Sequence, residues 1–81
     1  MKLLFTQRAR NDYDAFPPNI QKLADKQLDF LLKDLRYPSL NAKKYDEGRS
    51  ICQARITRDY RVYFLIEGDT YVILAMTKHP K

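Results

Sequence analysis

The chain has 81 residues, 44% of them hydrophobic, and a formal net charge of +5. This length predicts a single domain over residues 1–81, and the apolar share argues against intrinsic disorder. Because Cys52 is the only cysteine, an intrachain disulfide and a metal cluster built from several cysteines are excluded. This favours a reducing, cytoplasmic setting. No apolar run has the length of a membrane span.

The first half of the chain predicts a strand followed by two helices. Residues 2–6 alternate loosely and indicate a short strand, and Thr6 is a suitable N-cap for a helix over about residues 7–16. Pro17-Pro18 ends that helix and opens a second one. Apolar residues at helical spacing define the buried side of this second helix: Ile20, Leu23, Ala24, Leu28, Leu31 and Leu35. Tyr37-Pro38 predicts where it stops.

The second half predicts a three-stranded antiparallel meander. Residues 38–49 indicate a basic loop, and strands follow at about 50–57, 60–67 and 70–77. Thr57-Arg58-Asp59 predicts the first turn, and Glu67-Gly68-Asp69 predicts the second. The order β-α-α-β-β-β is typical of an α+β domain in which a helical hairpin packs on one face of a small antiparallel sheet.

Side chains alternate along a strand, so position parity predicts which face each one occupies. On the middle strand the core face is expected to hold Tyr60, Val62, Phe64 and Ile66. The opposite, open face is expected to hold Arg61, Tyr63, Leu65 and Glu67. On the preceding strand the core face takes Cys52, Ala54 and Ile56, and the open face takes Ile51, Gln53 and Arg55. We expect the core face to pack against Leu23, Leu28, Leu31 and Leu35 of the second helix.

The open face predicts an anion site. Arg55, Arg61 and Tyr63 lie on adjacent antiparallel strands and can converge. Two guanidiniums beside a phenol suit a phosphate, because arginine binds phosphate oxygens as a bidentate fork, and Tyr63 can stack on a base. The alternative is a solvated sheet face on which Arg55 pairs with Glu67. The residues alone leave both interpretations open.

The distribution of charge also indicates an anionic partner: nucleic acid, ribosome or an acidic protein segment. Residues 1–32 hold five Lys or Arg and four Asp or Glu, a balance of +1, whereas residues 33–81 hold ten and six, a balance of +4. The single histidine, His79, can serve as a general acid or base near neutral pH, or be an ordinary surface residue. The sequence contains no nucleophile–base set, glycine-rich phosphate loop or metal-ligand spacing.

Six short motifs over residues 37–79 form a recognisable set. They are Tyr37-Pro38-Ser39-Leu40, Lys43-Lys44, Ala54-Arg55-Ile56, Arg58-Asp59-Tyr60-Arg61-Val62, Glu67-Gly68-Asp69-Thr70 and Lys78-His79. Together they resemble the RelE/ParE superfamily of bacterial toxins from type II toxin–antitoxin systems, and with the helical hairpin the resemblance covers nearly the whole chain. It does not separate two branches. RelE-like members cut mRNA in the ribosomal A site, whereas ParE-like members poison DNA gyrase and have no nuclease activity.

The RelE-like branch implies an endoribonuclease, or mRNA interferase, that inhibits translation without a metal or organic cofactor. It also implies an acidic antitoxin as partner and mRNA on the ribosome as substrate. By motif, the catalytic positions are Arg61, His79 and Arg55. The RNA-binding positions implied are Lys43, Lys44, Arg49, Gln53, Arg58, Tyr63 and Lys78.

The chain departs from many RelE-like nucleases in two respects. Gln53 stands where some of them use lysine, and the sequence stops at Lys81, where many carry a further catalytic tyrosine or acid. The alternatives are a ParE-like inhibitor of DNA gyrase without nuclease activity and an inactive binding module of the same fold.

Overall fold

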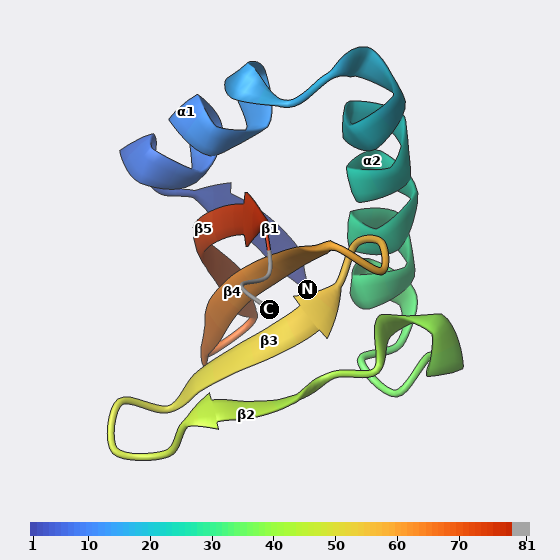
Figure 1. The fold of residues 1–81 in the computed structure, drawn as a ribbon. Helices are drawn as coiled ribbons and strands as arrows, with labels where there is room; N and C mark the ends of the chain where they lie inside the picture. The colour runs from blue at the N-terminus through green and yellow to red at the C-terminus, as the bar shows by residue number, and fades with distance from the viewer. Residues whose placement is uncertain (79–81) are drawn as a thin grey trace.

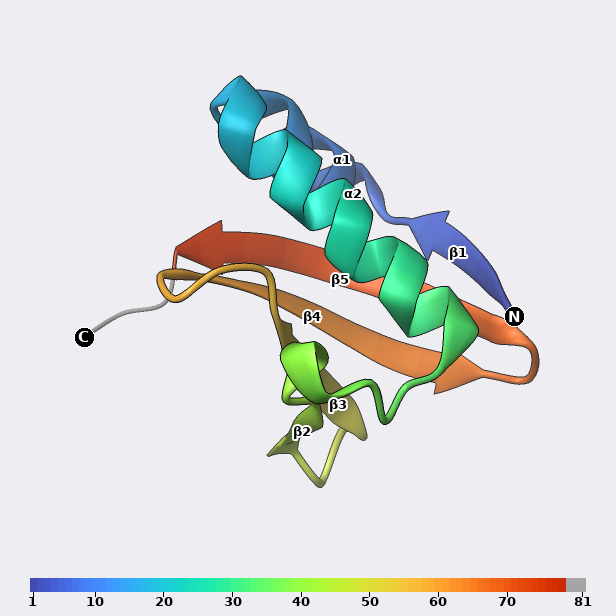
Figure 2. The same cartoon turned by 90° about the vertical axis from the view of Figure 1, so that its right-hand side faces the viewer.

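The computed structural model describes residues 1–78, which form two helices over one face of a five-stranded sheet (Figure 1). In chain order the elements are β1 (Lys2–Phe5), α1 (Gln7–Ala15), α2 (Pro18–Lys33), the 3-10 turn η1 (Pro38–Leu40), β2 (Lys43–Asp46), β3 (Ile51–Arg55), β4 (Tyr60–Glu67) and β5 (Thr70–Lys78). Figure 2 shows both helices on the same side of the strands. The α+β class and the helical hairpin are as expected from the sequence.

The sheet is mixed, and it has one strand more than the sequence predicted. Its order is β1-β5-β4-β3-β2. Strand β1 runs parallel to β5, whereas the other pairs are antiparallel. The prediction of a wholly antiparallel sheet was therefore wrong for β1. No tight turn joins β1 to its neighbour, since both helices and three strands separate them along the chain, so a hairpin does not dictate its direction.

Strand β2 lies in the segment that the sequence indicated was a basic loop. Residues Lys43–Asp46 lack an alternating apolar pattern and are mostly exposed, which is why periodicity did not reveal them. Their extended form comes from pairing with β3, in which Lys43 lies opposite Gln53 and Lys44 opposite Cys52. The pairing, not the local sequence, makes this segment a strand.

The helices begin as the sequence predicted, but α2 ends earlier. The Thr6 hydroxyl accepts a hydrogen bond from the Ala9 amide and caps α1, and Pro18 opens α2. Helix α2 stops at Lys33 rather than near Tyr37, because Asp34 is extended. The Asp34 carboxylate accepts a hydrogen bond from the Arg36 amide, a local bond that competes with helix continuation.

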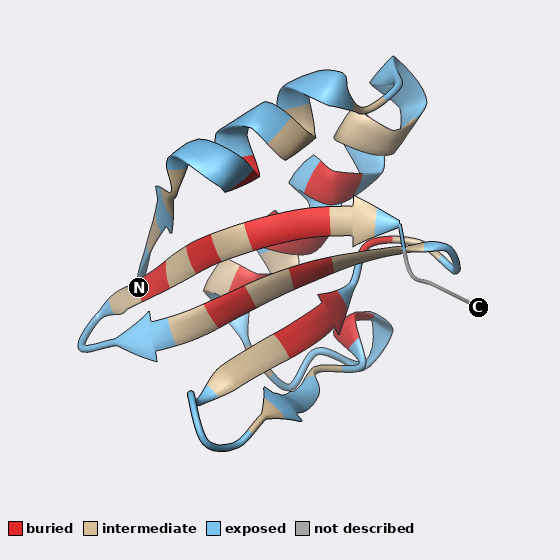
Figure 3. Ribbon diagram, turned by 60° about the vertical axis from the view of Figure 1, so that its left-hand side comes forward, coloured by how far each residue is buried: buried red, intermediate tan, exposed pale blue. Residues whose placement is uncertain are grey.

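The core lies between the two helices and the helix side of the strands; Figure 3 colours the buried residues red. Phe64, Val62, Ile73 and Met76 are almost completely buried there, together with Leu31. The prediction that Ile66 and Leu23 belong to the core was wrong: Ile66 is 45% exposed and Leu23 is 39% exposed. Ile66 lies near the end of β4, next to the exposed Glu67 and Gly68. Leu23 lies outside the buried set of α2, which is Ala24, Gln27, Leu28 and Leu31. Over residues 1–78, neither helix is long and apolar enough to cross a membrane.

Candidate functional site

The open face of the sheet, opposite the helices, carries two arginines side by side. Arg55 on β3 lies directly opposite Arg61 on β4, and Arg61 lies opposite Thr77 on β5. Among residues 1–78 no carboxylate lies within ion-pairing distance of either guanidinium. The alternative pairing of Arg55 with Glu67 is not formed, because Glu67 lies opposite Thr70 at the far end of β4. Two adjacent unneutralised cations repel each other and favour an anion between or above them.

Arg61 is held in place by the turn that precedes it. Its Nη1 donates to the backbone oxygens of Thr57 at 2.7 Å, Arg58 at 3.0 Å and Tyr60 at 3.0 Å. An arginine has five N–H donors, so Nε and Nη2 keep three that make no hydrogen bond within the described part of the chain. The turn thus orients the guanidinium while leaving one of its edges available for an oxyanion.

Gln27 of α2 fixes the end of the strand that carries Arg55. This side chain is buried, and its Nε2 donates to the backbone oxygen of Arg55 at 2.7 Å and to that of Ser39 at 3.0 Å. The Ser39 hydroxyl donates in turn to Gln27 Oε1 at 3.1 Å. This hub ties α2, η1 and β3 together, so the backbone beneath Arg55 is rigidly placed.

The next row of the open face holds no arginine. Lys43, Gln53, Tyr63 and Ala75 lie opposite one another on β2, β3, β4 and β5. Gln53 is only 8% exposed, and its Oε1 has no hydrogen-bond partner within residues 1–78. A role for Gln53 in contacting RNA stays a prediction, but its burial leaves little of the side chain for a ligand.

Two β-bulges flank Tyr63. On β2, Lys44 lies opposite Cys52 and Asp46 opposite Ile51, so Tyr45 is an extra residue. On β5 the register with β4 passes from Ile73 to Ala75, so Leu74 is an extra residue. Between them lies a hollow of about 390 Å³, which we call the bulge hollow, lined by Arg8, Tyr45, Ile51, Tyr63, Leu74, Ala75 and Thr77. The rings of Tyr45 and Tyr63 meet edge to face, 4.8 Å between centroids.

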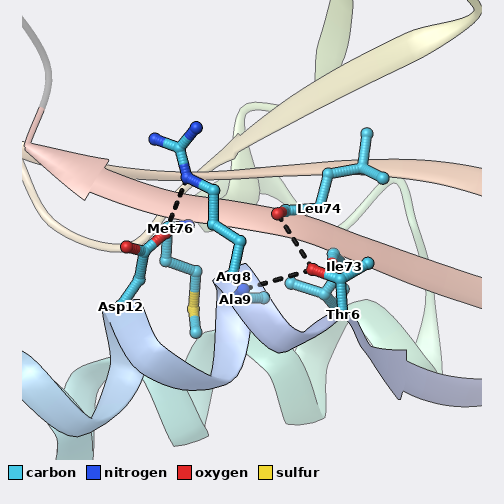
Figure 4. A network of polar contacts seen from close by, with 7 residues as sticks. All are labelled: Thr6, Arg8, Ala9, Asp12, Ile73, Leu74 and Met76. Carbon is cyan, nitrogen blue, oxygen red and sulfur yellow. Dashed lines mark hydrogen bonds and ion pairs between the residues drawn. The ribbon is translucent and has the colours of Figure 1, made fainter.

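Helix α1 reaches this hollow because it covers the part of β5 that β1 does not pair with. Figure 4 shows Thr6 and Asp12 on the edge of β5. The Thr6 hydroxyl lies 2.9 Å from the Ile73 oxygen and 3.0 Å from the Leu74 oxygen, and Asp12 accepts from the Met76 amide at 3.0 Å. Asp12 also pairs with Arg8 Nε at 3.6 Å. Sequence analysis missed Arg8 as a site residue; its i,i+4 spacing to Asp12 was the available signal.

The remaining basic residues predicted to bind RNA are divided between surfaces. Lys43 shares the open face, and the exposed Arg58 lies in the turn between β3 and β4. Lys44 and Lys78 lie opposite Cys52 and Tyr60, and therefore on the helix side. Lys44 lines a second hollow of about 460 Å³ beside η1.

The last two predicted site residues are Arg49 and His79. Arg49 is engaged by Asp46, with Nε 3.0 Å from Oδ2, in the turn between β2 and β3. His79, the predicted proton-transfer residue, lies outside the described residues. No three His, Cys, Asp or Glu side chains within residues 1–78 are grouped so as to hold a metal ion.

Comparison with known protein families decides the identity of the fold. Residues 3–79 match the family described as the ParE toxin of the type II toxin–antitoxin system parDE. The chain belongs to the ParE toxin family. It is accordingly the toxin of a type II toxin–antitoxin system, and the expected membership of the RelE/ParE superfamily is confirmed.

Solved structures of this kind of toxin share the ParE-family fold along almost the whole chain. A YoeB/ParE toxin from Agrobacterium tumefaciens is 14% identical, with 99% of this chain and 100% of that chain covered and a TM-score of 0.83. The RelE–RelB complex from Pyrococcus horikoshii OT3 is also 14% identical, with 99% and 96% covered and a TM-score of 0.81. The YoeB–YefM complex from Staphylococcus aureus is 16% identical, with 96% and 95% covered and a TM-score of 0.80.

These similarities establish the ParE-family fold, and at such low identity they do not extend to individual site residues. No curated protein sequence is significantly similar to the chain. The fold is found in proteins with YoeB, RelE and ParE names alike, so the molecular target must be inferred from this chain's own surface.

Proposed function

We propose that this toxin is a ribosome-dependent endoribonuclease that cleaves mRNA and thereby inhibits translation. The arginine pair on the open face carries the proposal: Arg55 and Arg61 face each other without a carboxylate partner among residues 1–78. Arg61 is oriented by the turn and retains donors for a phosphate. Tyr63, two residues from Arg61 on the same face, adds an aromatic ring for a base.

Positioned cations can accelerate RNA cleavage by stabilising negative charge that develops in the reaction. In the RelE-like reaction the 2′-hydroxyl of the RNA attacks the adjacent phosphorus and the bond from phosphorus to the 5′-oxygen breaks. The phosphorane formed on the way carries more negative charge than the starting diester. Arg61 would stabilise that charge with little reorganisation, because the turn holds its guanidinium, and Arg55 would approach from a strand end that the Gln27 hub holds. His79 is our candidate for moving the proton from the 2′-hydroxyl to the departing 5′-oxygen.

Controlled expression followed by mapping of mRNA 5′ ends tests this proposal. New 5′ ends should arise within translated codons. An inhibitor of translation initiation, which keeps ribosomes from loading onto mRNA, should suppress them. Arg61→Ala should remove them, whereas Arg10→Ala, a change on the outer side of α1, should not. Growth arrest without any new 5′ ends would overturn the nuclease proposal.

The second candidate is a ParE-like inhibitor of DNA gyrase without nuclease activity. It is favoured by the family match, which names the toxin of parDE. A supercoiling assay with purified gyrase distinguishes the two, because only this candidate predicts inhibition in the absence of ribosomes. If neither mRNA cleavage nor gyrase inhibition occurs, the chain is an inactive binding module of the same fold.

We further propose an acidic antitoxin as the partner. The solved complexes of similar fold pair YoeB with YefM and RelE with RelB. In this chain the balance of +4 in residues 33–81 calls for a segment of opposite charge. Such a segment would neutralise the toxin by covering Arg55 and Arg61 or by displacing an element of the site, and both would occur in the cytoplasm, where mRNA is translated.

A further inference from the structure

The bulge hollow is built by two irregularities of the sheet, one on each side of Tyr63. Tyr45 is the extra residue of the β2 bulge, and Leu74 is the extra residue of the β5 bulge. Bulges turn side chains out of the regular alternation and are common beside functional sites. Between these two, the small Ala75 leaves space on the sheet surface.

The shape and chemistry of the hollow suit a flat aromatic ring. Tyr45 is 62% exposed although it is large and aromatic, and it is oriented by its edge-to-face contact with Tyr63 rather than by a core. Ile51 and Leu74 supply apolar walls, and the Thr77 hydroxyl and Arg8 supply polar groups. A volume of about 390 Å³ is in the range of small-ligand sites.

The charge around the hollow selects the kind of ligand. None of its lining residues is acidic, and Arg8 lines it from α1. Asp12 pairs with Arg8 Nε at 3.6 Å and also accepts a hydrogen bond from the Met76 amide, so its charge is shared between the two groups. Thr77 belongs both to the hollow and to the row of Arg55 and Arg61. Residues two apart on a strand are about 6.6–6.8 Å apart, so Tyr63 and Arg61 are spaced for the base and the phosphate of one nucleotide.

We propose that the bulge hollow binds one unpaired base of single-stranded RNA. The base lies against Tyr45 and Tyr63, and the phosphates beside it contact Arg61 on one side and Arg8 on the other. This proposal rests on the proposed function, because it assigns the subsite that positions RNA next to the arginine pair. An apolar side chain of a protein partner is the competing occupant. A hollow that is lined by Arg8, and by Thr77 opposite Arg61, favours the polyanion.

Binding of modified oligonucleotides to the purified toxin tests the subsite without any cleavage. The probes are short 2′-O-methyl RNAs, which lack the attacking 2′-hydroxyl, each abasic at one position along the strand. In the wild-type toxin, abasic substitution at the position that occupies the hollow should weaken binding roughly 5- to 150-fold, the loss expected for one stacked base. Tyr45→Ala should weaken the complete probe by a similar factor and abolish the difference between the two probes.

Matched variants separate stacking from other effects. Tyr45→Phe keeps the ring and should retain the discrimination, and Leu74→Glu, which places a carboxylate in the hollow, should abolish it. Tyr37→Ala removes an exposed tyrosine outside the hollow and should change nothing. Circular dichroism of each variant checks that the fold is kept, which we expect because Tyr45 lies on an edge strand and outside the core.

Three outcomes would overturn the subsite. They are a wild-type toxin indifferent to every abasic position, a Tyr45→Ala variant that still discriminates, and a Tyr45→Ala variant that loses affinity for the antitoxin but not for the probes. Failure of the nuclease proposal looks different. In that case no mRNA 5′ ends arise in cells, while the uncleavable probes still report whether the hollow takes a base.

Discussion

Arg55 and Arg61 stand directly opposite each other on β3 and β4, two guanidiniums on one face with no carboxylate partner among residues 1–78. Like charges in directly opposed positions destabilise a sheet. The pair therefore carries a repulsion in the free protein that a bound anion would relieve.

We expect Arg55→Gln to stabilise the free toxin. Removing one of two repelling cations should raise the free energy of unfolding by about 0.2–1 kcal/mol at low salt. The gain in stability should shrink at about 1 M salt, where the screening length falls to about 3 Å. Urea denaturation at both salt concentrations measures it, with Arg10→Gln as the control for simple loss of positive charge. A destabilised Arg55→Gln at low salt would show that the two arginines do not repel.

Arg61→Ala should abolish toxicity while the fold persists. The expected loss of cleavage rate is on the order of 10²-fold or more, as for other charge-stabilising groups. Because Arg61 also binds the backbone oxygens of the turn, we expect a stability loss of about 1–3 kcal/mol as well. Arg61→Lys, which keeps the charge but not the fork, should be intermediate in activity. Growth arrest at wild-type strength with soluble Arg61→Ala would show that the site is elsewhere.

Phe64→Ala and Ile66→Ala should differ sharply, although both residues belong to one face of β4 by parity. Phe64 is fully buried, so its truncation should cost about 3–5 kcal/mol. Ile66 is 45% exposed, and its truncation should cost less than about 1 kcal/mol. Chemical denaturation of the two variants compares them directly. Equal losses would place Ile66 in the core after all.

Gln27→Leu should lower the free energy of unfolding, although leucine keeps much of the side-chain volume of glutamine. The change leaves the backbone oxygens of Arg55 and Ser39 without their donor, which predicts a loss of about 2–4 kcal/mol. Ser39→Ala removes only one bond of the hub and should cost about 0.5–1.5 kcal/mol. Gln7→Ala, which loses an exposed hydrogen bond to Asn11, is the control. If Gln27→Leu were neutral, the hub would have no part in holding β3.

Association with the antitoxin should be fast and should slow as salt rises. Opposite charges accelerate encounter, and salt screens that attraction. Stopped-flow rates for the proposed acidic antitoxin, measured at low and high salt, provide the comparison. A rate that does not depend on salt would contradict electrostatic steering, and no binding at all would favour an inactive module.

Local patterns in the sequence were sufficient for the elements that carry their own signal. The cap at Thr6, the proline break and the leucine spacing of α2 predicted the helical hairpin, and parity predicted that Phe64 is buried and Arg61 is not. These features depend on residues a few positions apart. The motif around Arg61 likewise indicated the toxin superfamily, because it too is a run of neighbouring residues.

Only the tertiary structure decided where distant segments meet. Strand β2 has no signal of its own and exists through its pairing with β3, and Ile66 is exposed because the end of β4 extends beyond the core. The bulges at Tyr45 and Leu74, and the anchoring of α1 on the edge of β5, bring Arg8 to the open face although it lies far from both bulges in the chain. A bulge changes which face the side chains beyond it occupy, and these two bulges arise in the pairing of strands rather than in a pattern of neighbouring residues.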